Sequence, residues 1–241
     1  MCNIFKFKQF TIEQSLCAMK VGTDGVLLGA WAEGGDNILD IGCGTGIISL
    51  MMAQRFPNSA IKSIDVVNEC CVQTRKNADD SLWNDRISVE NLSLQDFYTK
   101  QKNIRGLAEQ AKFDAIVSNP PFFVDSLKNP DKHRTLARHT DSLPFDVMVK
   151  CVRGLLKDGG VFSVILAEEC CNKFINEAWF AELYLCETVF IVTKKGKKTK
   201  RRLLRFSTNR NTIPSESTAL LQNDDGSRSE WFQNLTSEFY L

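Results

Sequence analysis

Short apolar runs alternate with helix-length segments along most of the chain, and this alternation predicts the fold. Strands that alternate with helices indicate a parallel sheet covered on both faces. Only a short polar stretch separates the last two runs, which favours an antiparallel last strand. We therefore predict an α/β fold with a doubly wound, mostly parallel, seven-stranded sheet. The predicted strands are Ile38–Ile41, Ala60–Val66, Arg86–Leu92, Phe113–Ser118, Val161–Leu166, Cys186–Thr193 and Arg202–Ser207.

The residues before the first of these strands follow a different pattern. Partial alternation between residues 4 and 21 predicts two short strands. The apolar segment Val26–Trp31 predicts a helix whose N-cap is Thr23 or Asp24. We therefore divide the chain into a short N-terminal hairpin and helix extension, residues 1–36, and a main domain, residues 37–241.

Composition and charge narrow the class of protein. The 241 residues can bury a sizeable core, and the net charge of +1 means that nucleic-acid binding requires local clusters of charge. The nine cysteines have no metal-ligand spacing, so we expect no metal. Their odd number, with no leader peptide, is typical of reduced thiols. No apolar run approaches the ~18 residues of a membrane span. These features predict a cytoplasmic protein that does not contact a membrane.

A proline-rich tetrapeptide, Asn119-Pro120-Pro121-Phe122, follows the fourth strand of the predicted sheet. Two consecutive prolines fix the backbone and remove two N–H donors, and a residue before proline is held extended. What remains is an amide oxygen, a carbonyl oxygen and an aromatic face. Two acceptors beside a stacking plane suit a planar amine, such as the exocyclic amino group of a nucleobase. The alternative interpretation is a rigid turn with no chemical role.

A glycine-rich turn follows the first strand of the sheet, in the sequence Asp40-Ile-Gly42-Cys-Gly44-Thr-Gly46. Glycines permit positive φ and a close approach of ligand to backbone, and such a turn opening a helix indicates a nucleotide-type site. Asp65 ends the next strand, where a carboxylate can accept both ribose hydroxyls of an adenosine. The alternative for Asp65 is a solvated acid at a strand end.

This arrangement resembles the class I S-adenosylmethionine-dependent methyltransferases, which have a Rossmann-like fold. The resemblance implies S-adenosyl-L-methionine as cofactor. It implies that Gly42, Gly44 and Gly46 pass the methionine moiety, with Asp40 near its ammonium group and Asp65 at the ribose. An acid after the third strand is typical of the class, near the adenine. Here Ser93 stands at that position and Asp96 three residues later, so either could contact the adenine.

The proline-rich tetrapeptide resembles the Asn/Asp-Pro-Pro-aromatic signature of methyltransferases that act on planar nitrogens. The resemblance implies a catalytic role for Asn119, Pro120, Pro121 and Phe122. Asn119 and the Pro120 carbonyl would accept the two N–H bonds of the target amine, and Phe122 would stack on the base. Asn119 would also contact the cofactor. Catalysis would be mainly proximity and orientation, without a dedicated general base.

The front of the chain narrows the resemblance to the bacterial tRNA(Val) adenine-N6-methyltransferase family. The residues that carry it are Lys8-Gln-Phe10, Cys17-Ala-Met-Lys-Val-Gly-Thr-Asp-Gly25, Leu27-Leu-Gly-Ala-Trp31 and the closing Phe239-Tyr-Leu241. The family implies tRNA as partner and methylation of the adenine just 3′ of the anticodon. The extension would pack over the cofactor site, with Lys20, Gly22 and Thr23 as cofactor contacts. The alternative for this segment is a hairpin and a helix cap.

Basic residues gather in two places that could contact RNA phosphates. One run joins the last two predicted strands and should emerge at the same sheet edge as Asn119; a second set follows the tetrapeptide. Such contacts position a nucleic acid without reading its sequence. The alternative is a solvated, flexible segment. The candidate RNA-binding residues are Lys194, Lys195, Lys197, Lys198, Lys200, Arg201, Arg202, Arg134 and Arg138.

Other functions fit parts of the same pattern. Asn-Pro-Pro-Phe also occurs in ribosomal RNA guanine-N2-methyltransferases, and enzymes that modify a protein glutamine amide share the chemistry. These relatives carry a duplicated domain or a preceding helical domain, which this chain lacks. A non-catalytic RNA-binding module is disfavoured because both motifs are intact. Short loops without a large apolar surface favour a monomer.

Overall fold

A mixed sheet of eight strands forms the centre of the molecule in the computed structural model, which describes residues 3–105, 112–121 and 143–241. Its spatial order is β10-β8-β9-β7-β6-β3-β4-β5. All neighbours are parallel except β9, which is antiparallel to both β7 and β8. The strands are β3 (Asn37–Ile41), β4 (Ala60–Asp65), β5 (Ile87–Asn91), β6 (Phe113–Ser118), β7 (Leu156–Ala167), β8 (Tyr184–Val192), β9 (Arg201–Ser207) and β10 (Ser215–Leu220).

The doubly wound, mostly parallel sheet is confirmed, but the predicted number of strands is wrong. The predicted antiparallel strand is β9, and it is followed by an eighth strand, β10, which pairs in parallel with β8. The sequence of β10, Ser-Glu-Ser-Thr-Ala-Leu, leaves its first four residues exposed. An edge strand with polar side chains on both faces has no apolar alternation, so the hydrophobic pattern does not reveal it.

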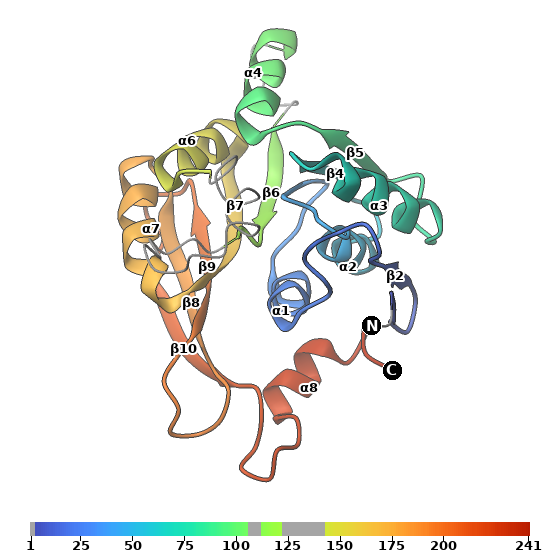
Figure 1. The fold of residues 1–241 in the computed structure, drawn as a ribbon. Helices are drawn as coiled ribbons and strands as arrows, with labels where there is room; N and C mark the ends of the chain where they lie inside the picture. The colour runs from blue at the N-terminus through green and yellow to red at the C-terminus, as the bar shows by residue number, and fades with distance from the viewer. Residues whose placement is uncertain (1–2, 106–111, 122–142) are drawn as a thin grey trace, which may run out of the picture.

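Helices cover both faces of the sheet, and the alternation along the strands sets which residues meet them (Figure 1). Ile38 joins the core under α1 and α2, whereas Leu39 joins the core under α4, α6 and α7. In β6, Ala115 and Ile116 divide in the same way. The described helices are α1 (Thr23–Trp31), α2 (Ile47–Arg55), α3 (Asn68–Asp79), α4 (Leu94–Arg105), α6 (Phe145–Leu155), α7 (Glu168–Phe180) and α8 (Glu230–Thr236). None of these helices is long and apolar enough to cross a membrane.

Helix α1 forms where the sequence predicts a helix, but its N-cap is neither Thr23 nor Asp24. Thr23 is already helical and Gly22 is the N-cap, without a side-chain hydrogen bond. Two glycines let the helix lie close to α2. A Cβ on Gly25 would stand 3.3 Å from Ile47 Cγ2, and one on Gly29 would stand 2.8 Å from Met51 Sδ. The small residues therefore allow α1 and α2 to lie close together.

The N-terminal hairpin packs against the C-terminal segment, so the two ends of the chain lie together (Figure 1). The hairpin consists of β1 (Ile4–Lys6) and β2 (Thr11–Glu13). Phe7 stacks on Phe10 and Tyr240, with ring centroids 4.6 and 5.8 Å away. Residues on both sides of position 36 share the core that contains α1 and α2. The division of the chain at residue 36 stays a prediction.

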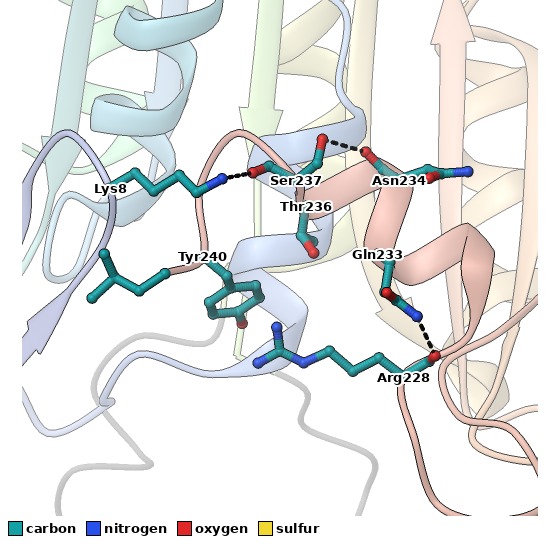
Figure 2. A pocket seen from close by; sticks show the side chains of 8 residues that line it. Lys8, Arg228, Gln233, Asn234, Thr236, Ser237 and Tyr240 are labelled. Carbon is teal, nitrogen blue, oxygen red and sulfur yellow. Dashed lines mark hydrogen bonds between the residues drawn. The ribbon is translucent and has the colours of Figure 1, made fainter.

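A polar pocket of about 400 Å³ opens where these two ends meet (Figure 2). Lys8 Nζ donates to the backbone oxygen of Ser237 at 2.6 Å, and the Arg228 guanidinium lies 4.4 Å from the centroid of the Tyr240 ring. None of the residues that line this pocket belongs to the candidate site. Its walls hold the C-terminal segment against the hairpin.

Candidate active site

The carboxyl ends of three neighbouring parallel strands bring the two sequence motifs together. β3 pairs with β4 and with β6, and Ile41 lies opposite both Ile64 and Ser118. The glycine turn, Asp65 and Asn119 therefore follow the sheet at the same edge. In doubly wound folds, ligands bind in the crevice outside this edge.

The glycine turn adopts a backbone that only glycine tolerates well. φ is +73° at Gly42, +56° at Gly44 and +80° at Gly46. An added Cβ at Gly42 or Gly44 would meet no atom of the described residues within 4 Å, so these residues leave the space over the two glycines open. A Cβ at Gly46 would stand 2.9 Å from Thr74 Cγ2, so the third glycine serves the packing of α2 against α3. The first two glycines thus leave room for a ligand, and the third supports the turn.

Asp40 is fully buried beneath the turn. Its Oδ2 accepts a hydrogen bond from Ser49 Oγ at 2.5 Å, and Ser49 Oγ lies 2.8 Å from Ser63 Oγ. Its Oδ1 has no hydrogen-bond partner among the described residues. Burial raises the pKa of the Asp40 carboxyl to about 7, and the hydrogen bond from Ser49 opposes this shift. A buried carboxylate with an unpaired oxygen is suited to a positively charged group.

Asp65 is partly exposed and held by two backbone amides. Its Oδ2 accepts from the Gly44 N–H and its Oδ1 from the Val67 N–H, each at 2.9 Å. Every carboxylate oxygen has further acceptor capacity, so these bonds orient the group without exhausting it. The side chains of Val66 and Val67 next to it are exposed. The arrangement offers acceptors for hydroxyl groups beside an apolar surface.

Asn119 stands at the end of β6, close to the start of α1. Its Oδ1 is buried without a hydrogen-bond partner among the described residues, and its Nδ2 would lie 4.0 Å from a Cβ on Gly25. Pro120 is half-buried and Pro121 exposed. An unpaired buried acceptor costs about 1–3 kcal/mol, so it marks a place where a partner is expected. Phe122 lies outside the described residues.

The predicted cofactor contacts from the front of the chain lie between the hairpin and α1. Lys20 Nζ donates to the backbone oxygens of Gln14 at 2.5 Å and Cys17 at 2.9 Å, so its ammonium group closes the local loop. Gly22 and Thr23 are exposed at the start of α1. Lys20 thus has a structural role in holding the loop before α1, and its contact with a cofactor stays a prediction.

The two candidates for the adenine contact bind each other. Ser93 Oγ donates to Asp96 Oδ2 at 2.6 Å and accepts from the Asp96 N–H at 3.0 Å. This is a capping arrangement at the start of α4. Both residues lie after β5, one strand beyond Asp65 in the sheet. Which of them contacts an adenine stays a prediction.

The basic run between β8 and β9 emerges at the same edge as the glycine turn, because β8 is parallel to the strands that carry the site. We call residues 194–200 the basic loop. Lys194 is half-buried, and the other lysines of the loop are exposed: Lys195, Lys197, Lys198 and Lys200. The loop thus leaves the sheet at the same edge as the site, and most of its lysines are exposed.

The two arginines that follow the loop differ from its lysines because they belong to β9 and form ion pairs. Arg201 Nε lies 2.9 Å from Asp24 Oδ2, which connects β9 to the first turn of α1. Arg202 pairs with the Glu168 carboxylate, with its Nε 2.7 Å from Oε2, and stacks on the Phe190 ring at 4.7 Å. Both are therefore engaged within the protein. Arg134 and Arg138 lie outside the described residues.

Sequence reasoning missed a group of polar side chains on α3. Gln73, Thr74 and Asn77 are buried and contact the glycine turn or the segment before α1. The available signal was their spacing, which places three polar residues on one face of a helix whose other buried positions are small or apolar. Among the described residues, no group of His, Cys, Asp and Glu could hold a metal ion.

Comparisons with known proteins define first a class and then a family. Residues 21–179 match the family described as the methyltransferase small domain. A crystal structure of a predicted O-methyltransferase from Agrobacterium tumefaciens superposes with a TM-score of 0.70 at 16% identity, covering 90% of this chain and 96% of that one. At that identity the likeness shows the fold alone. The match over residues 21–179 shows that the chain belongs to the methyltransferase small domain family.

Closer relatives define the family within this class. A tRNA1(Val) (adenine(37)-N6)-methyltransferase from Phocaeicola vulgatus is 47% identical, covering 98% of this chain and 97% of the relative. The protein of the same name from Bacteroides thetaiotaomicron is 42% identical, with the same coverage. The chain belongs to the tRNA1(Val) (adenine(37)-N6)-methyltransferase family.

Proposed function

We propose that this protein transfers a methyl group from S-adenosyl-L-methionine to the exocyclic N6 of an adenine in tRNA. The target is adenine 37, beside the anticodon of tRNA(Val), as the names of its relatives state for those proteins. The observation that carries the proposal is the buried Asn119 Oδ1, which has no hydrogen-bond partner within residues 3–105, 112–121 and 143–241 and lies at the same sheet edge as the open glycine turn.

The residues of the glycine edge fit the cofactor. The open space over Gly42 and Gly44 accepts a chain that runs close to the backbone. Asp40 Oδ1, which no described residue pairs with, suits an ammonium group beneath the turn, and Asp65 offers its remaining lone pairs to ribose hydroxyls. When bound, the cofactor supplies a methyl group on a positively charged sulfur.

Asn119 and Pro120 orient the target amine. The Asn119 Oδ1 and the Pro120 carbonyl oxygen accept its two N–H bonds, which fixes the plane of the base and directs the nitrogen lone pair. Positioning of this kind accounts for several kcal/mol of a barrier without any acid or base. The ring of Phe122 stacks on the base, which is worth roughly 1–3 kcal/mol. We assign no general base, because a methylated amine that still carries an extra proton is acidic enough to lose it to water.

The basic loop holds the RNA beside this edge. Its exposed lysines contact phosphates without reading the sequence. The same proposal places the protein in the cytoplasm with its tRNA and treats it as a monomer.

A labelling experiment tests the proposal. The purified protein is incubated with methyl-labelled S-adenosylmethionine and an unmodified tRNA(Val) transcript, and the RNA is digested to nucleosides. Labelled N6-methyladenosine confined to the anticodon loop is the expected result. Asn119→Ala should abolish the label while cofactor binding, measured by calorimetry, is retained; full activity of this variant would contradict the catalytic assignment.

The same assay separates the alternatives. Label in ribosomal RNA as N2-methylguanosine, or in a protein glutamine, would keep the amine chemistry and change the substrate. Cofactor binding without label in any RNA or protein would favour the RNA-binding module.

A further inference from the structure

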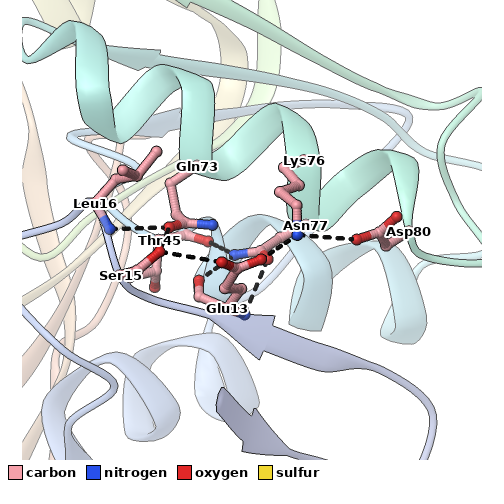
Figure 3. A network of polar contacts seen from close by, with 8 residues as sticks. All are labelled: Glu13, Ser15, Leu16, Thr45, Gln73, Lys76, Asn77 and Asp80. Carbon is pink, nitrogen blue, oxygen red and sulfur yellow. Dashed lines mark hydrogen bonds and ion pairs between the residues drawn. The ribbon is translucent and has the colours of Figure 1, made fainter. Parts of the chain in front are cut away.

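Helix α3 connects the N-terminal hairpin to the glycine turn through buried polar side chains (Figure 3). Gln73 Oε1 accepts from the Leu16 N–H at 3.1 Å, and Thr74 Oγ1 donates to the backbone oxygen of Gly44 at 2.9 Å. Asn77 lies one turn further along the same face. Because the three side chains point in one direction, the hairpin and the turn meet the same surface of the helix.

Asn77 uses both atoms of its amide on these two segments. Its Oδ1 accepts from the Glu13 N–H at 2.9 Å, and its Nδ2 donates to the Glu13 backbone oxygen at 2.8 Å. The same Nδ2 donates to the backbone oxygen of Thr45, also at 2.8 Å. The side chain thus pairs with one residue of β2 as a neighbouring strand would, and it also holds the glycine turn.

Helix α3 satisfies two backbone carbonyls of the glycine turn. The Gly44 oxygen accepts from Thr74 and also from Cys17 Sγ at 3.2 Å, and the Thr45 oxygen accepts from Asn77. Among the described residues, the positions that Cβ atoms on Gly42 and Gly44 would occupy are open. Protein groups therefore satisfy these carbonyls, and the space over the first two glycines is left for a ligand.

We propose that Asn77 is a positioning residue for cofactor binding. Its amide fixes the turn and the hairpin relative to each other, and so aligns the open face of the turn with the segment that leads into α1. This inference rests on the proposed function, because the ligand of the open face is the cofactor. It adds a residue outside both sequence motifs.

Two substitutions separate the parts of this contact. Asn77→Ala removes all three hydrogen bonds. Asn77→Asp keeps an acceptor for the Glu13 N–H but turns a carboxylate toward the carbonyl oxygens of Glu13 and Thr45. Both variants should therefore release the turn from β2. Val152→Ala serves as the matched control, since Val152 is fully buried in α6 on the other face of the sheet.

The experiment measures three quantities on each full-length variant: the melting temperature, the Kd for S-adenosylmethionine by calorimetry, and amide hydrogen exchange without cofactor. We expect both Asn77 variants to raise the Kd by about tenfold or more, the equivalent of one or two lost hydrogen bonds. Exchange should accelerate in residues 13–17 and 43–46. Val152→Ala should lower the melting temperature and leave the Kd within about twofold. Substitutions at distant sites act independently, so a cavity on the other face of the sheet should not change cofactor binding.

The outcomes are distinct. Asn77 variants that melt earlier but keep the wild-type Kd and the wild-type exchange at the turn would refute the positioning role and leave the proposed function intact. A wild-type protein that does not bind S-adenosylmethionine would refute the proposed function itself, and this inference with it.

Discussion

The buried Asp40 carboxyl should make the protein less stable as the pH rises, and Asp40→Asn should remove this effect. Its pKa is raised from 3.8 to about 7 by burial, so between these values the folded state holds a proton that the unfolded state has lost. Because the folded state binds more protons in this window, the free energy of unfolding falls as the pH increases. The loss begins near pH 4 and is complete just above pH 7.

The size of the effect follows from the two pKa values. The difference between 3.8 and about 7, at 1.36 kcal/mol for each unit, corresponds to roughly 4 kcal/mol over the whole window. Between about pH 5 and about pH 8 the expected loss is roughly 3 kcal/mol. Asparagine has nearly the same shape, can accept from Ser49 Oγ, and carries no charge at either pH.

Urea unfolding of the wild type and of Asp40→Asn at both pH values measures this effect. Subtracting one protein from the other cancels the opposite contributions of carboxyls whose pKa is lowered, such as Glu90 and Asp114. The variant should gain roughly 3 kcal/mol relative to the wild type on going from the lower to the higher pH. An equal difference at the two pH values would refute the reasoning.

The same variant should lose cofactor affinity while it gains stability. If Asp40 faces an ammonium group, the wild type should bind S-adenosylmethionine more tightly as the pH rises toward about 7, and Asp40→Asn should bind weakly at every pH. A gain in stability with unchanged affinity would place the ammonium group elsewhere.

Two further predictions follow from the turn and from the basic loop. Gly46→Ala should destabilise the protein by about 2–4 kcal/mol in urea, since it combines a positive φ with a clash against Thr74; Gly159→Ala, with a similar φ and open space, should cost only about 1–2 kcal/mol. Equal losses of stability in the two variants would mean that the turn shifts to relieve the clash with Thr74, which would contradict this prediction. The second variant replaces three exposed lysines of the basic loop with alanine: Lys197, Lys198 and Lys200. It should weaken tRNA binding, reduce the slope of log K against log salt by about 2, and leave the cofactor Kd unchanged. Wild-type RNA affinity would remove the loop from the proposed interface.

The sequence predicted those parts of the structure that depend on local patterns. Every strand candidate became a strand. The glycine turn and Asn119 were placed at one sheet edge because parallel strands determine where their ends lie. The sequence did not predict β10 because its mostly polar side chains show no alternation of apolar and polar residues. The N-cap of α1 was assigned to Thr23 or Asp24 because their side chains favour that role, but the backbone turns at Gly22 and Asp24 pairs with Arg201.

Partners that are distant in the chain explain what the sequence could not supply. In the sequence, the basic residues from Lys194 to Arg202 look equivalent. In the fold they differ, because the two arginines form ion pairs with Asp24 and Glu168, which belong to other elements. The same holds at the cofactor edge, where the support of the glycine turn comes from α3 rather than from the motif. A motif specifies the atoms that meet a ligand, because their chemistry constrains residue type and spacing. The residues behind them need only donate a hydrogen bond from the right place, and many sequences can do so. The supporting residues of this site therefore had to be found from the structure.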